Sequence, residues 1–316
     1  MRRIIPLELV GYKKLDYDLY DEKGEVVYKS GSELTPDILI MLNFKKVYIK
    51  DDITSLDFDK VKSYPGMKNS LEFESIISKN ATTLLVESTK DILKKVLKDK
   101  IPDISICITA RDTILQEVKE KLEKIECISQ LRVFDEYTFS HTINVSTISS
   151  ALGITLGLSE NDVKDLALGA LLHDIGKMRI PKNILNKPDK LTPSEFELVK
   201  KHTTLGYQFI MEKMDLQDKI AKVALEHQEK YGGEGYPNGL KNKEISLFAQ
   251  ITSIADVYDA LISKRVYKKA IFSKDALKIM LSEGSSSFNP YMLYKFVFLA
   301  KYKDKVNLSI NEEDKI

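Results

Sequence analysis

Hydrophobic residues recur at intervals of three and four positions along most of the chain after its first 58 residues. That spacing is typical of helices with one buried face. Earlier in the chain, β-branched and aromatic residues gather in short segments such as 26–28 and 46–50, with glycine turns between them. Thr35-Pro36-Asp37 predicts one short helix there, with Thr as its cap and Pro at its first position. We therefore predict a mainly α protein that begins with a small α+β module, residues 1–58, with a packing or regulatory role.

The next segment, residues 59–110, has the pattern of a helical connector. Its apolar positions lie among many lysines and glutamates, as in amphipathic helices. The lysines between 94 and 100 fit a solvated helix face better than a surface for nucleic acid. Because amphipathic helices often pack against a second copy, we expect that a homodimer would form through residues 59–128. The apolar positions are Leu71, Ile76, Ile77, Leu84, Leu85, Ile92, Leu93, Val96 and Leu97.

Two histidines lie on the first two predicted helices of the remaining chain. The first helix has an apolar face that includes His141, and we expect it to end at Gly153. Ser159, with an acidic residue three positions on, predicts the start of the next helix, which runs into His173 and is expected to stop at Gly176. The face of the first helix is formed by Phe134, Thr138, His141, Val145 and Ile148.

Three further helices bring polar side chains onto apolar faces. Thr192-Pro193-Ser194-Glu195 predicts the start of a helix with His202 on its apolar face, and His227 lies on the apolar face of the following helix. A last helix bears Asp256 and Asp259. The pattern predicts an all-helical bundle whose inward faces present polar groups from five helices. The apolar positions of the last three are Phe196, Val199 and Gly206; Ile220 and Val223; and Ile251, Ile254, Val257 and Leu261.

Composition narrows the class of partner and the compartment. Lys and Arg number 48 against 47 Asp and Glu, so the net charge of +1 gives no overall electrostatic case for a nucleic acid polymer or a membrane surface. The two cysteines, Cys107 and Cys127, lack C-x-x-C spacing and suit a reducing compartment. Because no apolar stretch approaches the ~18 residues of a membrane span and the N-terminus lacks a signal-peptide pattern, we expect a cytoplasmic protein.

The chain has only four histidines, and all of them fall between positions 141 and 227. Imidazole is the commonest protein ligand for transition metals, so we expect the four to share one metal centre with Asp174 and Asp256. Imidazole nitrogen together with carboxylate oxygen suits iron, manganese or zinc better than calcium or magnesium. A carboxylate such as Asp174 can also bridge two cations ~3.5–4 Å apart. The alternative is a set of unrelated histidines on helix surfaces or in the core.

Six motifs in the last 200 residues or so resemble, in the correct order, the HD-GYP family of HD-domain phosphohydrolases. They are Leu171-Leu172-His173-Asp174-Ile175-Gly176-Lys177, Ile180-Pro181, Ile184-Leu185, Gly235-Tyr236-Pro237, Asp256-Val257-Tyr258-Asp259-Ala260-Leu261 and Arg265-Val266-Tyr267. The resemblance predicts that residues 111–316 form an HD-GYP all-helical bundle. Residues 1–58 lie outside it.

The resemblance implies a phosphodiesterase that hydrolyses the bacterial second messenger cyclic di-GMP to linear pGpG and onward to GMP. It implies two divalent metal ions, iron or manganese favoured, and a bridging role for Asp174. Signalling proteins would be its partners. The implied metal ligands are His141, His173, Asp174, His202, His227 and Asp256. The implied catalytic residues are Asp174, Lys177 and Asp259, with Lys177 beside the metals and paired with Asp259. The implied substrate-binding residues are Tyr236, Arg265 and Lys268.

Three positions depart from the family pattern. Gln228 follows His227 where the family usually has a second histidine, so Gln228 is expected to be a weak ligand at best. Gly232-Gly233 replaces an expected Asp, and this change is expected to loosen the loop. Tyr137 stands where some relatives have a glutamate ligand, so a third metal is not expected. Glu229, like Asp162, is expected to be a solvated helix charge.

Two functions compete with cyclic di-GMP hydrolysis. Gln228 favours a degenerate domain that acts as a cyclic dinucleotide receptor or interaction module without turnover. The second alternative is another substrate: a mixed cyclic dinucleotide, which the sequence does not exclude, or a nucleoside monophosphate, against which the Gly-Tyr-Pro loop argues. Lys177 and Asp259 could also form a purely structural ion pair.

Overall fold

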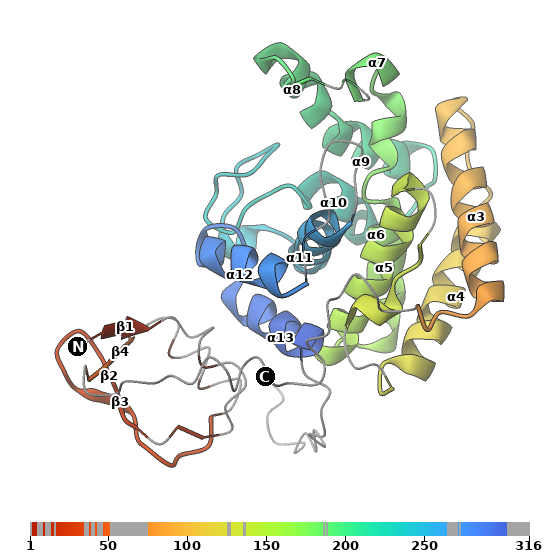
Figure 1. Cartoon of the computed structure of the whole chain (residues 1–316). Coiled ribbons are helices and arrows are strands. Elements are labelled where there is room, and N and C mark those ends of the chain that lie inside the picture. The colour runs from red at the N-terminus through yellow and green to blue at the C-terminus, as the bar shows by residue number, and fades with distance from the viewer. Residues whose placement is uncertain are drawn as a thin grey trace.

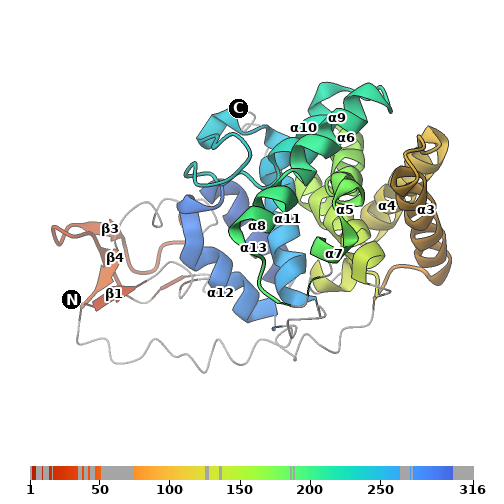
Figure 2. The same cartoon turned by 90° about the horizontal axis from the view of Figure 1, so that it is seen from above.

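The computed structural model describes residues 2–4, 9, 14–15, 17–34, 38, 42, 47–50 and 75–301, except 125–127, 135–136, 186, 188, 264–270 and 272. Helices form most of it, as predicted, and a small sheet lies to one side of the helical bundle (Figures 1 and 2). The α-helices are α3 (Lys79–Leu97), α4 (Ile104–Lys121), α5 (Tyr137–Thr155), α6 (Glu160–Leu172), α7 (Lys182–Leu185), α8 (Pro193–Lys200), α9 (His202–Glu212), α10 (Asp218–Glu226), α11 (Leu247–Ile262), α12 (Ser273–Glu283) and α13 (Pro290–Lys301). Short 3₁₀ helices are η3 (Ile128–Leu131), η4 (Ile175–Arg179), η5 (Asn242–Glu244) and η6 (Gly284–Ser286).

The N-terminal sheet has four short strands in the order β1-β4-β2-β3, and every pairing in it is antiparallel. The Asp21 carboxylate shapes the β2–β3 turn by accepting hydrogen bonds from the backbone N–H groups of Lys23 and Glu25, both at 2.9 Å. Thr35-Pro36-Asp37, the predicted helix start, lies outside the described residues. The strands are β1 (Arg2–Ile4), β2 (Leu19–Tyr20), β3 (Val26–Tyr28) and β4 (Val47–Ile49).

Helix α5 is the central element of the bundle, and it is buried along most of its length although it is rich in serine and threonine. It packs against α6 and α11, and the α3–α4 pair covers another side of it. Some of its hydroxyls are satisfied within the helix: Thr147 donates to the Ile143 carbonyl at 2.9 Å and Ser150 to the Ser146 carbonyl at 2.7 Å. A polar-looking segment can therefore lie in the core without unpaired hydroxyls at these positions.

Two glycines act differently from the sequence prediction. Gly153 does not end its helix: α5 continues to Thr155, and Gly157, with φ +77°, makes the left-handed turn. Gly176 does not stop α6 either, because α6 ends at Leu172 and Gly176 lies inside η4. A Cβ at Gly176 would lie 1.9 Å from the His202 carbonyl oxygen. Gly176 is thus required for the close approach of η4 to the start of α9.

The segment after residue 192 forms two helices where one was predicted. Its start is as expected, since Thr192 and Glu195 form a reciprocal capping box with Pro193 in the first turn. Lys201 separates α8 from α9, so Phe196 and His202 lie on different helices. None of the described α8 side chains is buried, and Phe196 is 44% exposed.

The predicted helical connector corresponds to an antiparallel pair, α3 and α4. The first helix begins later than its apolar pattern suggested: Ile76 and Ile77 precede it, and Ser78 is its cap. Helix α4 runs across position 110, so the proposed connector and the proposed bundle domain share it. The predicted domain boundaries at residues 58 and 110 therefore remain predictions. A homodimer through residues 59–128 also remains a prediction.

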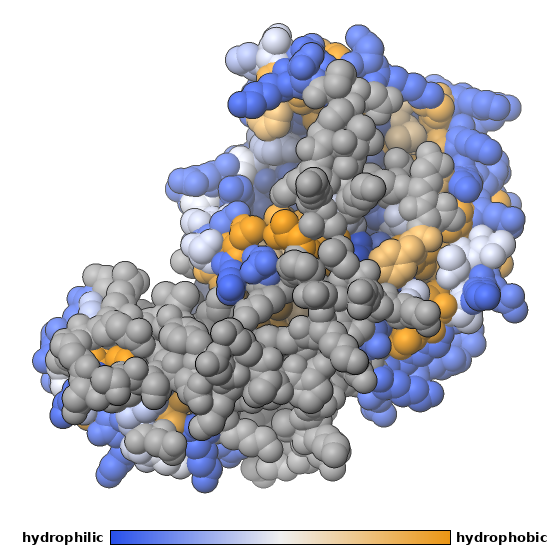
Figure 3. Space-filling view, in the orientation of Figure 1, coloured by the Kyte–Doolittle hydropathy of each residue, from blue (hydrophilic) through white to orange (hydrophobic). Residues whose placement is uncertain are grey.

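The polarity of the described surface and the lengths of the described helices agree with what the composition predicted. Polar and charged residues cover most of the described face shown in Figure 3, with hydrophobic residues between them near its middle. Among the described residues, no helix is long and apolar enough to cross a membrane.

Substitution of Gly176 by Ala should destabilise the protein by about 3 kcal/mol, at the upper end of the usual cost of overpacking, because backbone atoms cannot yield as a side-chain tip can. Gly157→Ala is the matched control: no atom lies within 4 Å of its added Cβ, so only the left-handed backbone cost of about 1–2 kcal/mol applies. Urea unfolding followed by circular dichroism compares the two. Equal midpoints would contradict the close approach of η4 and α9.

Candidate metal centre

Five helices bring the predicted metal ligands to one place. His141 lies in the first half of α5, and Asp256 lies on α11. The other three histidines are at helix ends: His173 and His227 cap the C-termini of α6 and α10, and His202 is the first residue of α9. All four imidazoles are buried. Edge-to-face ring contacts connect them, with centroid distances between 5.1 and 5.5 Å.

The Nδ1 atom of every histidine faces a hydrogen-bond acceptor. In His173 it lies 2.7 Å from the Ala170 carbonyl, and in His202 it lies 2.7 Å from the Val199 carbonyl. His227 contacts the carbonyls of Val223 and Ala224 at 3.1 and 3.0 Å. In His141 the acceptor is the Asp259 carboxylate, 2.8 Å away. Because these acceptors require a proton on Nδ1, the neutral rings present their Nε2 lone pairs to the interior.

The four Nε2 atoms surround the two oxygens of Asp174. His173 and His141 approach Oδ2 at 3.3 and 3.9 Å, whereas His202 and His227 approach Oδ1 at 3.5 and 3.6 Å. Each carboxylate oxygen thus has two imidazole nitrogens beside it. This is the arrangement that a bridging carboxylate between two cations requires.

The donor atoms fit a cation better than they fit one another. His173 Nε2 and Asp174 Oδ1 are buried and have no hydrogen-bond partner among the described residues. The Nε2 atoms of His202 and His227 lie only 3.3 Å apart, although the Nδ1 contacts leave neither with a proton to donate. Three sets of donors each lie within 4.8 Å of one another: His141, His173 and Asp174; His173, His227 and Asp256; and Asp174, His202 and His227. Such buried donors, which do not satisfy one another, are a set of atoms that a cation would satisfy.

The charges around the site keep its carboxylates ionised. Burial alone would raise the pKa of Asp174, but the Lys177 ammonium and the neighbouring His173 hold it well below its ordinary value. Burial lowers the pKa of His202 to about 4, against the opposing influence of Asp174. Burial also acts to lower the pKa of His141, yet its hydrogen bonds with Asp256 and Asp259 raise it to about 9. A proton and a cation therefore compete for His141, and metal affinity should fall as the pH is lowered.

Asp259 does not pair with Lys177, contrary to the sequence prediction. Its side chain is fully buried and accepts hydrogen bonds from Arg132 Nε at 2.9 Å and from Asn144 Nδ2 at 3.1 Å, besides its contact with His141. Ser263 donates to its other oxygen at 3.1 Å. Asp259 therefore orients His141 from behind. Arg132 gave no signal in the sequence, because its partner is 127 positions away.

Lys177 instead extends from η4 to the central carboxylate. Its Nζ lies 2.5 Å from Asp174 Oδ2. The side chain is about one-third exposed, so its ammonium lies between the buried donors and solvent. A cation in this position can contact an anionic group that enters the site from outside.

Gln228 lies at the edge of the donor cluster. Its amide Nε2 donates to Asp256 Oδ2 at 3.1 Å. The other oxygen of Asp256 lies 3.2 Å from His141 Nε2. Gln228 thus engages one oxygen of a predicted metal ligand instead of adding an imidazole.

The sequence predicted that Gly232-Gly233 would loosen the Gly-Tyr-Pro loop. Hydrogen bonds instead fix this loop to the rest of the structure. Gly232 donates its N–H to the Ser286 carbonyl at 2.9 Å. Glu229 is buried, not solvated, and its carboxylate accepts from the N–H groups of Asn238 and Leu240 at 2.7 and 3.1 Å. Tyr236 is held with its ring 6.3 Å from that of His202.

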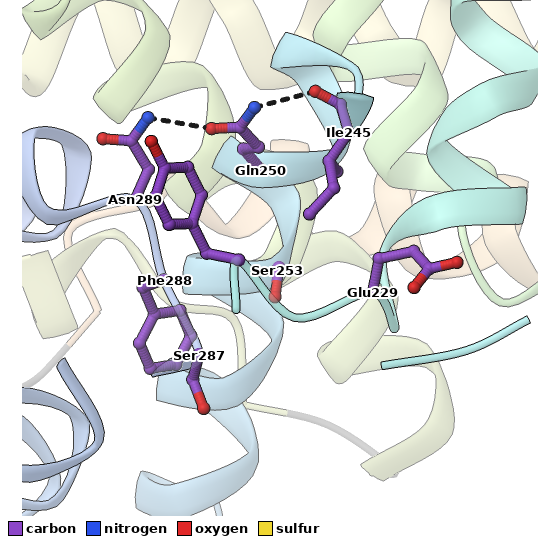
Figure 4. A pocket seen from close by; sticks show the side chains of 8 residues that line it. Glu229, Ile245, Gln250, Ser253, Ser287, Phe288 and Asn289 are labelled. Atoms are coloured by element: carbon purple, nitrogen blue, oxygen red, sulfur yellow. Dashed lines mark hydrogen bonds between the residues drawn. The ribbon is translucent and has the colours of Figure 1, made fainter. Parts of the chain in front are cut away.

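A small pocket, shown in Figure 4, has a lining that includes none of the predicted metal ligands. Asn289 donates to Gln250 at 2.9 Å, and Gln250 donates to the Ile245 carbonyl at 2.7 Å. These contacts connect α11, through Gln250, to Ile245 and to Asn289, which directly precedes α13. The lining residues are Glu229, Tyr231, Ile245, Gln250, Ser253, Ser287, Phe288 and Asn289. The predicted substrate-binding residues Arg265 and Lys268 lie outside the described residues.

Comparison with known proteins agrees with this architecture. The HD domain family matches residues 113–291. A cyclic di-GMP phosphodiesterase of Pseudomonas aeruginosa is 38% identical over 186 residues, which cover 59% of this chain and 45% of that protein. A cyclic di-GMP phosphodiesterase of Thermotoga maritima is 36% identical over 196 residues, 62% of this chain and 53% of that protein. The chain thus spans about half the length of these curated relatives.

A solved structure is similar over nearly the whole chain. It is that of an HDG"Y"P protein from Bdellovibrio bacteriovorus, with a TM-score of 0.55, 21% sequence identity and coverage of 93% of this chain and 97% of that one. At this identity the likeness concerns the fold.

We predict that Asp259→Asn lowers the affinity for Mn²⁺ by 10- to 100-fold, the usual effect of losing a carboxylate behind a histidine ligand. The amide leaves the Arg132 charge without its counter-charge and weakens the hold on His141 Nδ1. Isothermal titration calorimetry measures the affinity, and Asp162→Asn, at an exposed carboxylate of α6, is the matched control. Equal affinities of the two variants would contradict an orienting role of Asp259.

Proposed function

The chain belongs to the HD-GYP branch of the HD domain family, and on that premise we propose that it is a metal-dependent phosphodiesterase that hydrolyses cyclic di-GMP to linear pGpG and onward to GMP. The observation that supports this proposal most is the convergence of four buried imidazoles on Asp174, each with Nδ1 on an acceptor. Both curated relatives described above are named for this activity.

The proposed cofactor is a pair of divalent cations, with iron or manganese favoured by the mixture of imidazole and carboxylate donors. His141, His173 and Asp174 would hold one ion and Asp174, His202 and His227 the other, with Asp256 completing the set. When bound, such cations lower the pKa of water and polarise phosphoryl oxygens. Tyr137 offers no carboxylate for a third ion.

The protein's own groups would bind and orient the substrate. Lys177 is placed to neutralise a phosphoryl oxygen, because its ammonium lies at the solvent side of Asp174. Tyr236 presents an aromatic ring beside His202, where a guanine base can stack. Arg265 and Lys268 are proposed as phosphate or guanine contacts from the sequence resemblance. In hydrolysis, water adds to phosphorus and the ribose 3′ oxygen leaves.

A receptor without turnover is the second candidate, and Gln228 is the observation that favours it. Its amide lies on Asp256 Oδ2 and supplies no imidazole to the centre. An amide oxygen is a weaker donor to iron or manganese than imidazole. A cyclic dinucleotide could then bind to a poorly loaded site and remain intact.

The remaining parts of the chain are assigned by sequence alone. We propose that residues 1–58 form a regulatory module, residues 59–110 a helical connector and residues 111–316 the phosphohydrolase domain. A homodimer through residues 59–128 and signalling proteins are the proposed partners. The substrate would place the activity in the cytoplasm.

The test begins with anaerobic purification, measurement of metal per chain, and chromatography of the products of cyclic di-GMP. We expect two metals per chain and accumulation of pGpG, with a mixed cyclic dinucleotide run in parallel to compare rates. Asp174→Ala should lose both metal and turnover, because it removes the carboxylate shared by the two sets of donors. Metal-loaded protein that binds cyclic di-GMP without producing pGpG would establish the receptor, and retention of metal by Asp174→Ala would contradict the proposed centre.

Gln228→His should raise metal occupancy and the hydrolysis rate, since the new imidazole would add a donor and release Asp256 Oδ2. Metal analysis after dialysis and the initial rate of pGpG formation measure the two effects. Gln228→Asn separates the added imidazole from the lost contact with Asp256: it should not gain metal. If both variants gain metal equally, the native glutamine hinders the site only through its hydrogen bond.

A further inference from the structure

Phe196 is a large apolar side chain in an unusual place for one that only fills space. It lies on α8, whose described side chains are all outside the core, and 44% of its surface is exposed. Single exposed hydrophobic residues are common, so exposure by itself assigns no function. The ring nevertheless contacts Tyr236 of the Gly-Tyr-Pro loop, with centroids 6.4 Å apart and planes at 76°.

Phe196 and Tyr236 continue a row of rings that starts in the metal centre. His202 and Tyr236 have their centroids 6.3 Å apart with planes at 81°. The row therefore leads from the buried ring of His202, through Tyr236, to the exposed ring of Phe196. Because the two ring planes are nearly perpendicular, Tyr236 and Phe196 form two walls of a corner, and the Phe196 wall is exposed to solvent.

Lys200 adds a cation to this corner. Its Nζ lies 5.0 Å from the centroid of Phe196 and 5.6 Å from that of Tyr236, and Glu197 holds it at 2.7 Å. An ammonium over two aromatic rings is attracted by both. It is also a hydrogen-bond donor of the kind that recognises the N7 and O6 acceptors of guanine.

We propose that Phe196 and Lys200 form an outer base-binding site, in which one purine base of the cyclic dinucleotide stacks on Phe196 while Lys200 donates to its acceptor edge. The inference rests on the proposed function and extends it, since it assigns binding residues on α8, outside the motifs of the Gly-Tyr-Pro loop and the metal centre. The face of Phe196 suits this role because every base can stack on an aromatic ring, whereas the Lys200 ammonium selects purines whose edge carries acceptors.

The test compares KM and kcat of the full-length, metal-loaded protein on cyclic di-GMP. Phe196→Leu should raise KM about tenfold, which corresponds to ~1.4 kcal/mol and lies in the range of one base–aromatic stack, while kcat and metal content change little. Phe196→Tyr keeps an aromatic face and should recover a KM near that of the unaltered protein. Leu198→Ala removes another exposed apolar side chain of α8 and is the matched control.

Inhibition by inorganic phosphate separates base binding from damage to the centre. Phosphate has no base, so its inhibition constant should be the same for Phe196→Leu and the unaltered protein. Equal KM values for Phe196→Leu and Leu198→Ala would overturn the inference, and so would a loss of phosphate binding and metal together with the rise in KM.

The experiment distinguishes a failure of the proposed function from a failure of this inference. If the unaltered protein hydrolyses cyclic di-GMP and Phe196→Leu does so with an unchanged KM, only the inference is wrong. If it binds the dinucleotide without turnover, the same variants are compared by their dissociation constants, with the same tenfold loss expected. If it neither binds nor hydrolyses cyclic di-GMP, both proposals are wrong.

Discussion

The structure depends on one hydrogen-bonding constraint: each of four buried imidazoles has Nδ1 committed to an acceptor, so each must present Nε2 to the interior. Three of the imidazoles face backbone carbonyls at helix ends, which are free to accept because α6, α8 and α10 end where they do. The fourth faces Asp259, which Arg132 and Asn144 hold in place. The helix ends and this buried network together create four inward lone pairs around one carboxylate, a set of atoms that attracts cations.

Much of this site could be predicted from the sequence, because spacing of three and four identifies the buried face of a helix. The concentration of all four histidines between positions 141 and 227 predicted their convergence, and the structure brings together His141, His173, His202 and His227 with Asp174 and Asp256. Long-range pairing could not be predicted in the same way. Lys177 pairs with Asp174 instead of Asp259, because η4 directs it back to its own neighbour, and Arg132 reaches Asp259 across 127 positions.

The errors at helix ends and in the loop have a common cause: glycine and charged residues were interpreted from local pattern, whereas tertiary contacts decide their roles. Gly176 admits the backbone of α9 and Gly157, not Gly153, turns the chain. Glu229 is buried because it satisfies the N–H groups of the Gly-Tyr-Pro loop, which thereby holds Tyr236 beside His202. The same loop brings the ring of Tyr236 into contact with both His202 and the exposed ring of Phe196.

The most direct measurement of the central claim is anomalous X-ray diffraction from crystals grown with manganese, recorded at the manganese absorption edge. The account predicts two anomalous peaks on either side of the Asp174 carboxylate, one beside His173 Nε2 and the other beside the Nε2 atoms of His202 and His227. Absence of any peak at Asp174, with manganese found only at surface carboxylates, would contradict it.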